Sequence, residues 1–202
     1  MRLLSCLAAA LALAACGPVQ NAAEPATEDT AAAAGQTAAP APAEPPDVIY
    51  DVTPQNVVEA MLKLGDVKPG DVLYDLGSGD GRIPITAARQ FGIRAVGIDI
   101  DPQLIAESQA NAKEAGVERL VSFRNEDLFT ADIKEASVVT LFLHDSLNEK
   151  LRPKLLAELK PGTRIVSHAF RMGDWKPQQE AQVGRSRIYM WTVPARGAGA
   201  AP

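Results

Sequence analysis

Carboxylates and glycines alternate in the segment Asp-Leu-Gly-Ser-Gly-Asp-Gly-Arg, which spans residues 75–82. Two further carboxylates, Asp99 and Asp127, each come at or just after the end of a short apolar stretch typical of a buried strand. Glycines let the backbone approach a ligand closely, and a helix that starts after them offers free N–H groups. We therefore expect a ligand-binding crevice beyond the carboxyl ends of the strands.

The glycine spacing indicates which ligand the crevice holds. A dinucleotide fingerprint, G-x-G-x-x-G, requires glycine at position 82, where this chain has Arg82. The pattern is instead acid-x-G-x-G-x-G, and Asp75 is the acid. A carboxylate there would repel a pyrophosphate, but it suits the amino group of a zwitterionic ligand that carries a sulfonium. The Asp99 carboxylate can accept hydrogen bonds from both hydroxyls of a ribose. The Asp127 carboxylate can accept one from the amino group of an adenine.

Strand-like and helix-like stretches alternate from Tyr50 onward, which is typical of a mostly parallel sheet covered by helices. Thr53 as N-cap and Pro54 as first residue predict a helix to about residue 64. Further helices are expected at 82–91, at 102–115, where Asp101-Pro102 caps the start, and at 147–159. Strands are expected at 71–76, 94–98, 120–124, 137–143 and 163–170, and a terminal antiparallel pair at 182–193.

These residues resemble motifs I to III of the class I S-adenosylmethionine-dependent methyltransferases. The run Tyr-Asp-Leu-Gly-Ser-Gly-Asp-Gly-Arg-Ile is similar to one in small bacterial methyltransferase-domain proteins, which are themselves similar to the mitochondrial lysine methyltransferases of carrier and ATP-synthase subunits. The resemblance covers about residues 50–193, including Leu143-His144-Asp145 and the segment 173–177. It implies an α/β, Rossmann-like fold with a mostly parallel seven-stranded sheet, helices on both faces and an antiparallel terminal strand pair.

The resemblance also implies S-adenosyl-L-methionine as the cofactor. It implies that Asp75, Gly77 and Gly79 hold the methionine moiety, and that Asp99 and Asp127 hold the ribose and the adenine. For the methyl acceptor it implies only a tendency toward protein lysine, so a small molecule stays open. The full set of expected cofactor-binding residues is Asp75, Gly77, Ser78, Gly79, Asp80, Gly81, Asp99, Ile100, Asp127 and Leu128.

His144 and Asp145 follow the fourth expected strand, where such enzymes meet the acceptor. A protein accelerates an in-line methyl transfer chiefly by aligning donor and acceptor and excluding water, and a lysine acceptor must also lose a proton. We expect Asp145 to orient the acceptor and His144 to act as base. The alternatives are an N-cap role for Asp145 and a backbone-bonded loop histidine for His144.

Other side chains near these strand ends have less specific roles. His168 is expected to be a hydrogen-bonded core or rim residue. Phe170 and Trp175 either wall the acceptor channel or pack against the sheet edge, and Tyr50 is a candidate to close over the donor. The fourth strand is not followed by Asn/Asp-Pro-Pro-Tyr, which disfavours amino groups of adenine or glutamine as acceptors.

The N-terminus has the pattern of a lipoprotein signal peptide over residues 1–15. An apolar run of 11 residues precedes Leu-Ala-Ala-Cys, which matches the lipobox and predicts lipidation of Cys16. An ordinary secretory signal or a misassigned start codon are the alternatives. An Ala/Pro-rich tether is expected over 16–46, the methyltransferase domain over 47–193 and a disordered tail over 194–202. The protein would be lipid-anchored in the cell envelope, facing the periplasm or exterior, or cytoplasmic without the signal.

The net charge of −5 opposes a nucleic-acid-binding surface. Cys6 and Cys16 both lie near the N-terminus, so the folded domain can hold neither a disulfide nor a thiolate metal site. We expect no bound metal. Separately, we expect the protein to be a monomer. The main alternative is a non-catalytic S-adenosylmethionine- or nucleoside-binding lipoprotein, because the cofactor is made in the cytoplasm and a lipobox directs export. A nicotinamide-dependent oxidoreductase and a structural lipoprotein are weaker alternatives.

Overall fold

The computed structural model describes residues 51–195, which contain four helices and seven strands, largely in alternation. The expected signal peptide, the lipidated Cys16, the tether and Tyr50 lie outside the described residues, as does the tail from residue 196 onward. Among the residues described, no helix has the length and apolar content needed to cross a bilayer.

The strands form one sheet in the order β3-β2-β1-β4-β5-β7-β6. The first five strands in this order are parallel to one another, whereas β7 is antiparallel to both β5 and β6. This arrangement confirms the expected fold class. In chain order the strands are β1 Val72–Leu76, β2 Arg94–Asp99, β3 Val121–Asn125, β4 Val138–Leu141, β5 Arg164–His168, β6 Gln179–Val183 and β7 Ser186–Thr192.

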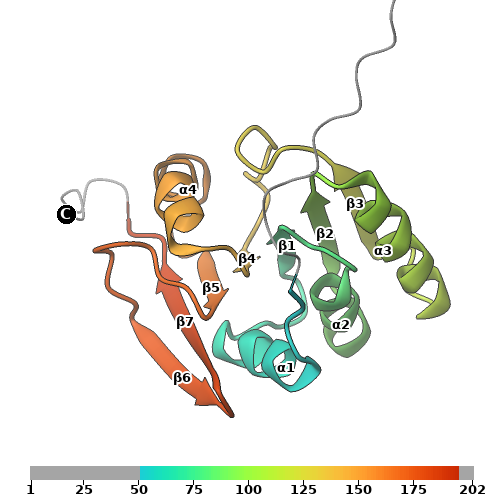
Figure 1. The fold of residues 1–202 in the computed structure, drawn as a ribbon, viewed down its shortest axis with the longest axis horizontal. Coiled ribbons are helices and arrows are strands. Elements are labelled where there is room, and N and C mark those ends of the chain that lie inside the picture. Colours follow the sequence, from blue (N-terminus) through green and yellow to red (C-terminus); the bar gives the residue numbers. More distant parts are fainter. Residues whose placement is uncertain (1–50, 196–202) are drawn as a thin grey trace, which may run out of the picture. The chain divides into compact units, whose positions relative to one another are not determined.

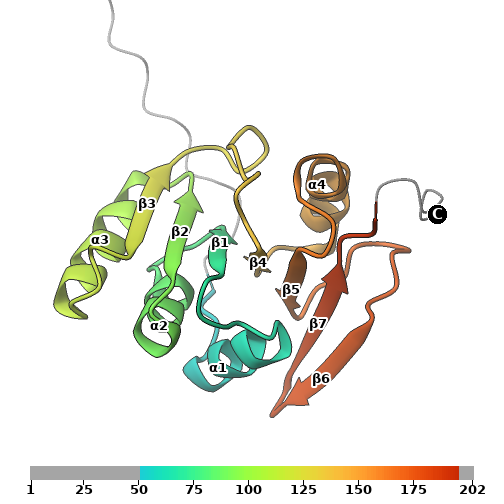
Figure 2. The same ribbon diagram turned by 180° about the vertical axis from the view of Figure 1, so that it is seen from behind.

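Helices cover both faces of the sheet (Figure 1). On one face lie α1 Gln55–Leu64, α2 Arg82–Phe91 and α3 Pro102–Glu114; α4 Asp145–Glu158 lies on the other, with the β3–β4 connection (Figure 2). Successive strand residues face opposite sides. Leu73 of β1 therefore packs in the core under α1 to α3, and Tyr74 packs in the core under α4.

Two helix starts differ from the expectation. Pro54, not Thr53, holds the N-cap position of α1, because the Thr53 hydroxyl contacts Nδ1 of His168 at 3.1 Å instead of capping the helix. The α4 helix begins at Asp145, two residues before the expected Leu147, and it continues through Pro153. The first terminal strand, β6, begins at residue 179 rather than 182.

The N-terminus of α3 is capped as the sequence predicts. The Asp101 carboxylate accepts a hydrogen bond from the backbone N–H of Gln103 at 2.8 Å, and Pro102 occupies the first helical position. Side-chain caps of this kind satisfy a donor that the helix itself leaves without a partner.

We predict that Asp101→Ala lowers the free energy of unfolding by about 1 kcal/mol, because that N–H loses its cap. Urea denaturation of the folded domain measures the change. Glu114→Ala, which removes an exposed carboxylate at the other end of α3, is the matched control and should change stability by no more than about 0.5 kcal/mol. Equal losses in both variants would contradict the capping account.

Candidate functional site

A cleft lies at the carboxyl end of β1, where the strand order reverses between β1 and β4. Ligands bind at such switch points in open α/β sheets. The cleft is lined by Asp51, Val52, Thr53, Asp75, Gly77, Ser78, Gly79, Asp80, Arg82, Ile83 and Phe142. It therefore contains five of the ten residues expected to bind the cofactor, together with a segment before α1 that the sequence did not point to.

Asp75 is the most buried carboxylate of the cleft, with 2% of its surface exposed. Thr140 of β4 donates a hydrogen bond to it at 2.7 Å, and no basic side chain of residues 51–195 forms an ion pair with it. Burial raises the pKa of Asp75 to about 8; the negative charges of Asp99 and Asp80 add to this rise, and the Thr140 bond opposes it. A cationic ligand group would supply the missing countercharge.

The glycine turn after β1 is tied to the end of β2. Backbone N–H groups of Gly77 and Ser78 donate to the carbonyl oxygen of Ile98, and the N–H of Gly79 donates to Asp99 Oδ2 at 2.8 Å. The other Asp99 oxygen accepts from the N–H of Asp101 at 3.0 Å. Because each carboxylate oxygen can accept more than one hydrogen bond, Asp99 keeps acceptor capacity for hydroxyl groups.

Gly81 packs the helix closely against the sheet. It is the N-cap residue of α2 with φ of 80°, and a Cβ atom there would lie 2.5 Å from Phe123 Cζ and 2.8 Å from Ser108 Cβ. Any other residue would clash and would also be strained by the positive φ. Gly81 is absent from the cleft lining, so its observed contacts are with the protein rather than with the cleft.

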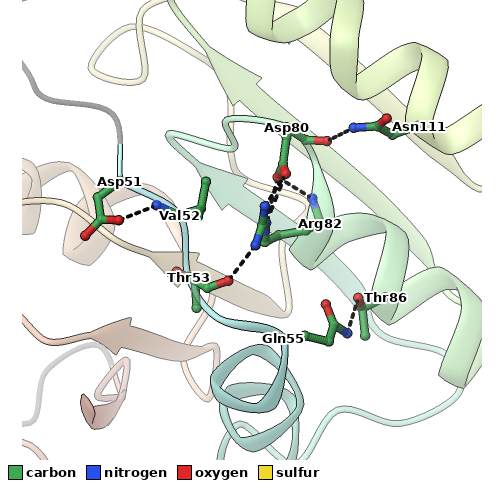
Figure 3. Close-up of polar contacts among 8 residues, drawn as sticks. All are labelled: Asp51, Val52, Thr53, Gln55, Asp80, Arg82, Thr86 and Asn111. Carbon is green, nitrogen blue, oxygen red and sulfur yellow. Dashed lines mark hydrogen bonds and ion pairs between the residues drawn. The ribbon is translucent and has the colours of Figure 1, made fainter. Parts of the chain in front are cut away.

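Asp80 and Arg82 join the glycine turn to the N-terminal segment. The Asp80 carboxylate accepts from the Arg82 side chain at 2.5 to 3.0 Å, and Arg82 Nη1 donates to the carbonyl oxygen of Thr53 at 3.0 Å (Figure 3). Asn111 of α3 donates to the Asp80 carbonyl oxygen. The sequence predicted Asp80 as a cofactor ligand, and its carboxylate is engaged by Arg82. The cation directly after the glycines was the available signal for this link.

The residues expected around the adenine lie farther along the same sheet edge. Ile100 is 59% exposed beside Asp99, and Asn125 fixes this segment by donating to the carbonyl oxygens of Asp99 and Ile100. Asp127 accepts from the N–H of Phe129 at 2.8 Å, so it caps a turn, and the half-buried Leu128 packs on the core. Ile100, Asp127 and Leu128 do not line the cleft.

The two residues expected on the acceptor side have defined contacts. His144 is the exposed N-cap residue of α4, so the alternative of an N-cap role for Asp145 is wrong. Asp145 is the first helical residue, and its carboxylate accepts from the backbone N–H of Arg171 at 2.7 Å. This bond joins the start of α4 to the loop after β5. Among residues 51–195, no donor forms a hydrogen bond with the other Asp145 oxygen.

His168 is the buried, hydrogen-bonded residue that the sequence predicts. It is 5% exposed, contacts the Thr53 hydroxyl and stacks on Phe142 with 4.1 Å between ring centroids. Burial lowers the pKa of His168, although the Asp51 carboxylate opposes this. Trp175 packs on Trp191 of β7, with 6.1 Å between ring centroids, so it lies on the sheet face that α4 covers rather than in the cleft or at the sheet edge.

A family model described as the ANTKMT methyltransferase domain matches residues 75–179, about half of the chain. The chain belongs to this family. The match begins at Asp75 near the end of β1. It includes the glycine turn, β2, and the segments that follow β4 and β5.

Individual proteins agree with this assignment. The chain is 48% identical to a protein-lysine N-methyltransferase of Saccharolobus islandicus, over 68% of this chain and 86% of that protein. It is 37% identical to the mouse adenine nucleotide translocase lysine N-methyltransferase, of which it spans only 61%. A crystal structure described as an RNA methyltransferase from Salinibacter ruber, in complex with S-adenosyl-L-homocysteine, is 55% identical, with a TM-score of 0.72 over 75% of this chain and 97% of that one.

This protein is therefore an S-adenosylmethionine-dependent methyltransferase with a Rossmann-like fold. The chemistry of the cleft fits that cofactor, because a buried carboxylate without a countercharge lies beside a glycine turn and near Asp99. The family assignment sets aside the oxidoreductase and the structural lipoprotein. Within residues 51–195, no cluster of His, Cys, Asp or Glu has the grouping of a metal site.

We predict that cofactor binding releases protons near neutral pH. The pKa of Asp75 is about 8 in the free protein, and a cationic ligand stabilises the carboxylate, so the pKa falls on binding. Between these two pKa values the affinity rises with pH. Calorimetry at pH 7 in two buffers with different ionisation enthalpies should give different binding enthalpies, and Asp75→Asn should abolish the difference. Identical enthalpies for the wild type would contradict the prediction.

We also predict that Asp75→Asn stabilises the ligand-free protein above neutral pH. The folded pKa of Asp75 lies above the unfolded value of 3.8, so this residue destabilises the fold increasingly as pH rises from 3.8 toward 8. At pH 8 the gain should be several kcal/mol and at most about 6 kcal/mol, since the pKa rise from 3.8 to about 8 is roughly four units of about 1.4 kcal/mol each. Thermal unfolding between pH 4 and pH 8 measures it. The exposed Asp132→Asn is the control, and a pH-independent difference would refute the explanation.

Proposed function

We propose that this methyltransferase transfers the methyl group to a lysine side chain of a protein, with Asp75, Gly77, Gly79 and Asp99 holding the cofactor. The observation that carries the cofactor assignment is the buried, uncompensated carboxylate of Asp75 in the cleft. Its negative charge suits the ammonium group at the amino-acid end of S-adenosylmethionine, because an opposite charge stabilises a buried carboxylate.

Asp99 and the residues after β3 complete the proposed cofactor site. Asp99 lies at the end of β2 beside the glycine turn, and its carboxylate would accept hydrogen bonds from the ribose hydroxyls. The exposed Ile100 would cover one side of the adenine, and Asp127 would accept its amino group. Asp127 already accepts the N–H of Phe129, so its second oxygen would serve this role. Asp80, Gly81, Ser78 and Leu128 would act by shaping the turns around the ligand.

Two independent observations support lysine as the acceptor. The relatives from Saccharolobus islandicus and mouse are both named lysine methyltransferases. In addition, exposed carboxylates stand around the carboxyl ends of the strands: Asp51, Glu126, Asp127 and Asp145. Negative charge at the rim attracts a cationic lysine segment and repels the phosphates of a nucleic acid.

The Salinibacter ruber structure, described as an RNA methyltransferase, raises RNA as the second candidate acceptor. A surface that binds RNA neutralises phosphates with lysine and arginine. The net charge of −5 and the acidic rim count against this candidate for the present chain.

When bound, S-adenosylmethionine supplies a methyl group on a positively charged sulfur. The acceptor lysine nitrogen must lose a proton before its electron pair can take the methyl group, and the cofactor, held by Asp75, Gly77, Gly79 and Asp99, would supply that group with its sulfur as a neutral thioether leaving group. Asp145, through its second oxygen, would orient the lysine, and the exposed ring of His144 would accept the proton; the support is their position at the start of α4, after β4. Alignment and exclusion of water provide the rest of the acceleration.

The acceptor class is tested with purified protein and a cofactor that carries a tritiated methyl group. We expect label to enter hexalysine but neither hexaarginine nor a single-stranded RNA oligonucleotide, because an arginine side chain stays protonated. Mass spectrometry should show increments of one methyl group on lysine. Label in the RNA alone would contradict the lysine proposal and support the second candidate.

We also propose that the full chain is a lipoprotein of the cell envelope, anchored through Cys16. The support is the sequence of residues 1–16, an apolar run followed by Leu-Ala-Ala-Cys. The full chain expressed in bacteria with radioactive palmitate should carry label in the membrane fraction, and Cys16→Ala should carry none. An unlabelled wild-type protein in the cytoplasmic fraction would overturn the anchor without affecting the methyltransferase.

A further inference from the structure

Four ring side chains form a continuous stack beside the cofactor cleft, which we call the aromatic wall: Phe142, His144, His168 and Phe170. Phe142 stacks on His168 at 4.1 Å and lies 6.0 Å from Phe170, and His144 lies 4.7 Å from Phe170, all between ring centroids. Phe142 and His144 follow β4, and the other two stand at the end of β5 and just after it. The wall thus joins the loops that follow two adjacent strands.

The wall runs from the cofactor cleft to the protein surface. Phe142 lines the same cleft as Asp75 and is half-buried, whereas His144 at the other end is exposed. Phe170, between them, is also half-buried and does not line the cofactor cleft. His168 is buried behind Phe142 and is held by Thr53, so it is a positioning residue rather than a contact for a ligand.

A strained turn sets the position of Phe170. Ala169 has φ of 63°, and the N–H of Phe170 donates to the carbonyl oxygen of His168 at 2.7 Å. A bond across a single residue with positive φ defines the classic γ-turn, which is rare and strained. Such conformations are costly and cluster at functional sites. The N–H of Ala169 is fixed by the Arg187 carbonyl oxygen of β7 at 2.7 Å.

Charge around the wall favours a cation. Asp51 lines the cleft on the side of the N-terminal segment, and Asp145 follows His144 directly. Aromatic faces attract ammonium groups that come within about 6 Å, and the methylene stem of lysine packs well on apolar surface. A path with aromatic sides and carboxylates near both ends matches a lysine side chain better than it matches a nucleotide.

We propose that Phe142, Phe170 and His144 form the channel along which the acceptor lysine reaches the cofactor, and that Phe170 determines specificity for that side chain. This inference rests on the proposed lysine methyltransferase activity. The two hydrogen bonds that fix the turn at Ala169 hold the Phe170 ring against the other two, so that the lysine stem meets a preformed surface. A preformed surface avoids the entropic cost of ordering side chains on binding.

The test is the methylation kinetics of hexalysine with Phe170→Leu, Phe170→Tyr and Ala169→Gly. Phe170→Leu removes the ring, and we expect KM for hexalysine to rise roughly tenfold, the order expected for a lost cation–π contact. Phe170→Tyr keeps the ring and should restore KM. Ala169→Gly keeps every side chain of the wall and both hydrogen bonds of the turn while relieving the positive-φ strain, so it should leave KM unchanged without loss of stability.

Two controls separate the channel from the cofactor site and from the fold. Phe91→Leu alters a half-buried phenylalanine at the far end of α2 and should leave KM unchanged. Calorimetric affinity for S-adenosylhomocysteine should be the same in wild type, Phe170→Leu and Phe91→Leu, which shows that the variants fold and bind.

Each outcome decides between the two proposals. If wild type methylates hexalysine and Phe170→Leu behaves as Phe91→Leu does, the channel is overturned and the lysine activity stands. If wild type binds S-adenosylhomocysteine but labels no lysine, the lysine proposal is overturned and the channel with it. An increase in KM confined to Phe170→Leu, with affinity for S-adenosylhomocysteine unchanged, supports the channel.

Discussion

The site depends on one electrostatic constraint, the burial of the Asp75 carboxylate without a countercharge from residues 51–195. Such a group is costly to keep ionised, and the rise of its pKa to about 8 reflects this cost. A protein selected only for stability would replace it. Its presence makes the cleft complementary to a cation, and it explains why ligand binding, protonation and stability are linked through one residue. The Thr140 hydroxyl holds the carboxylate in place by a hydrogen bond, but it supplies no positive charge.

The rest of the fold brings the cofactor site and the acceptor side together. The carboxyl ends of the parallel strands lie along one side of the sheet, so Asp75 near the end of β1, Asp99 at the end of β2 and Phe142 after β4 converge there. The N-terminal segment closes one side of the cleft and is held from both halves of the sheet. Arg82 binds the Thr53 carbonyl oxygen from the side of α2, and His168 binds the Thr53 hydroxyl from β5. Thr53 therefore couples the glycine turn to the base of the aromatic wall.

The local features of the site were predictable where a single residue's chemistry dictates them. The acid-x-G-x-G-x-G pattern predicted the turn and its place after β1, and Asp101-Pro102 predicted the start of α3. The contacts that sequence reasoning missed join residues far apart in the chain: Arg82 with Thr53, and Thr53 with His168. Capping propensity assigned Thr53 to α1, but a buried histidine across the sheet competes for the same hydroxyl. The γ-turn at Ala169 was equally invisible, because alanine carries no signal for positive φ.

The central claim is that the cleft beside Asp75 and Asp99 binds S-adenosylmethionine. The most direct measurement is calorimetric titration of the fragment from Asp47 to Val193 with S-adenosylmethionine and S-adenosylhomocysteine, alongside an Asp99→Ala variant. Both ligands should bind the wild-type fragment with micromolar affinity, about −8 kcal/mol, and should not bind the folded variant. A folded wild-type fragment that binds neither ligand, or a variant that binds as tightly as wild type, would contradict it.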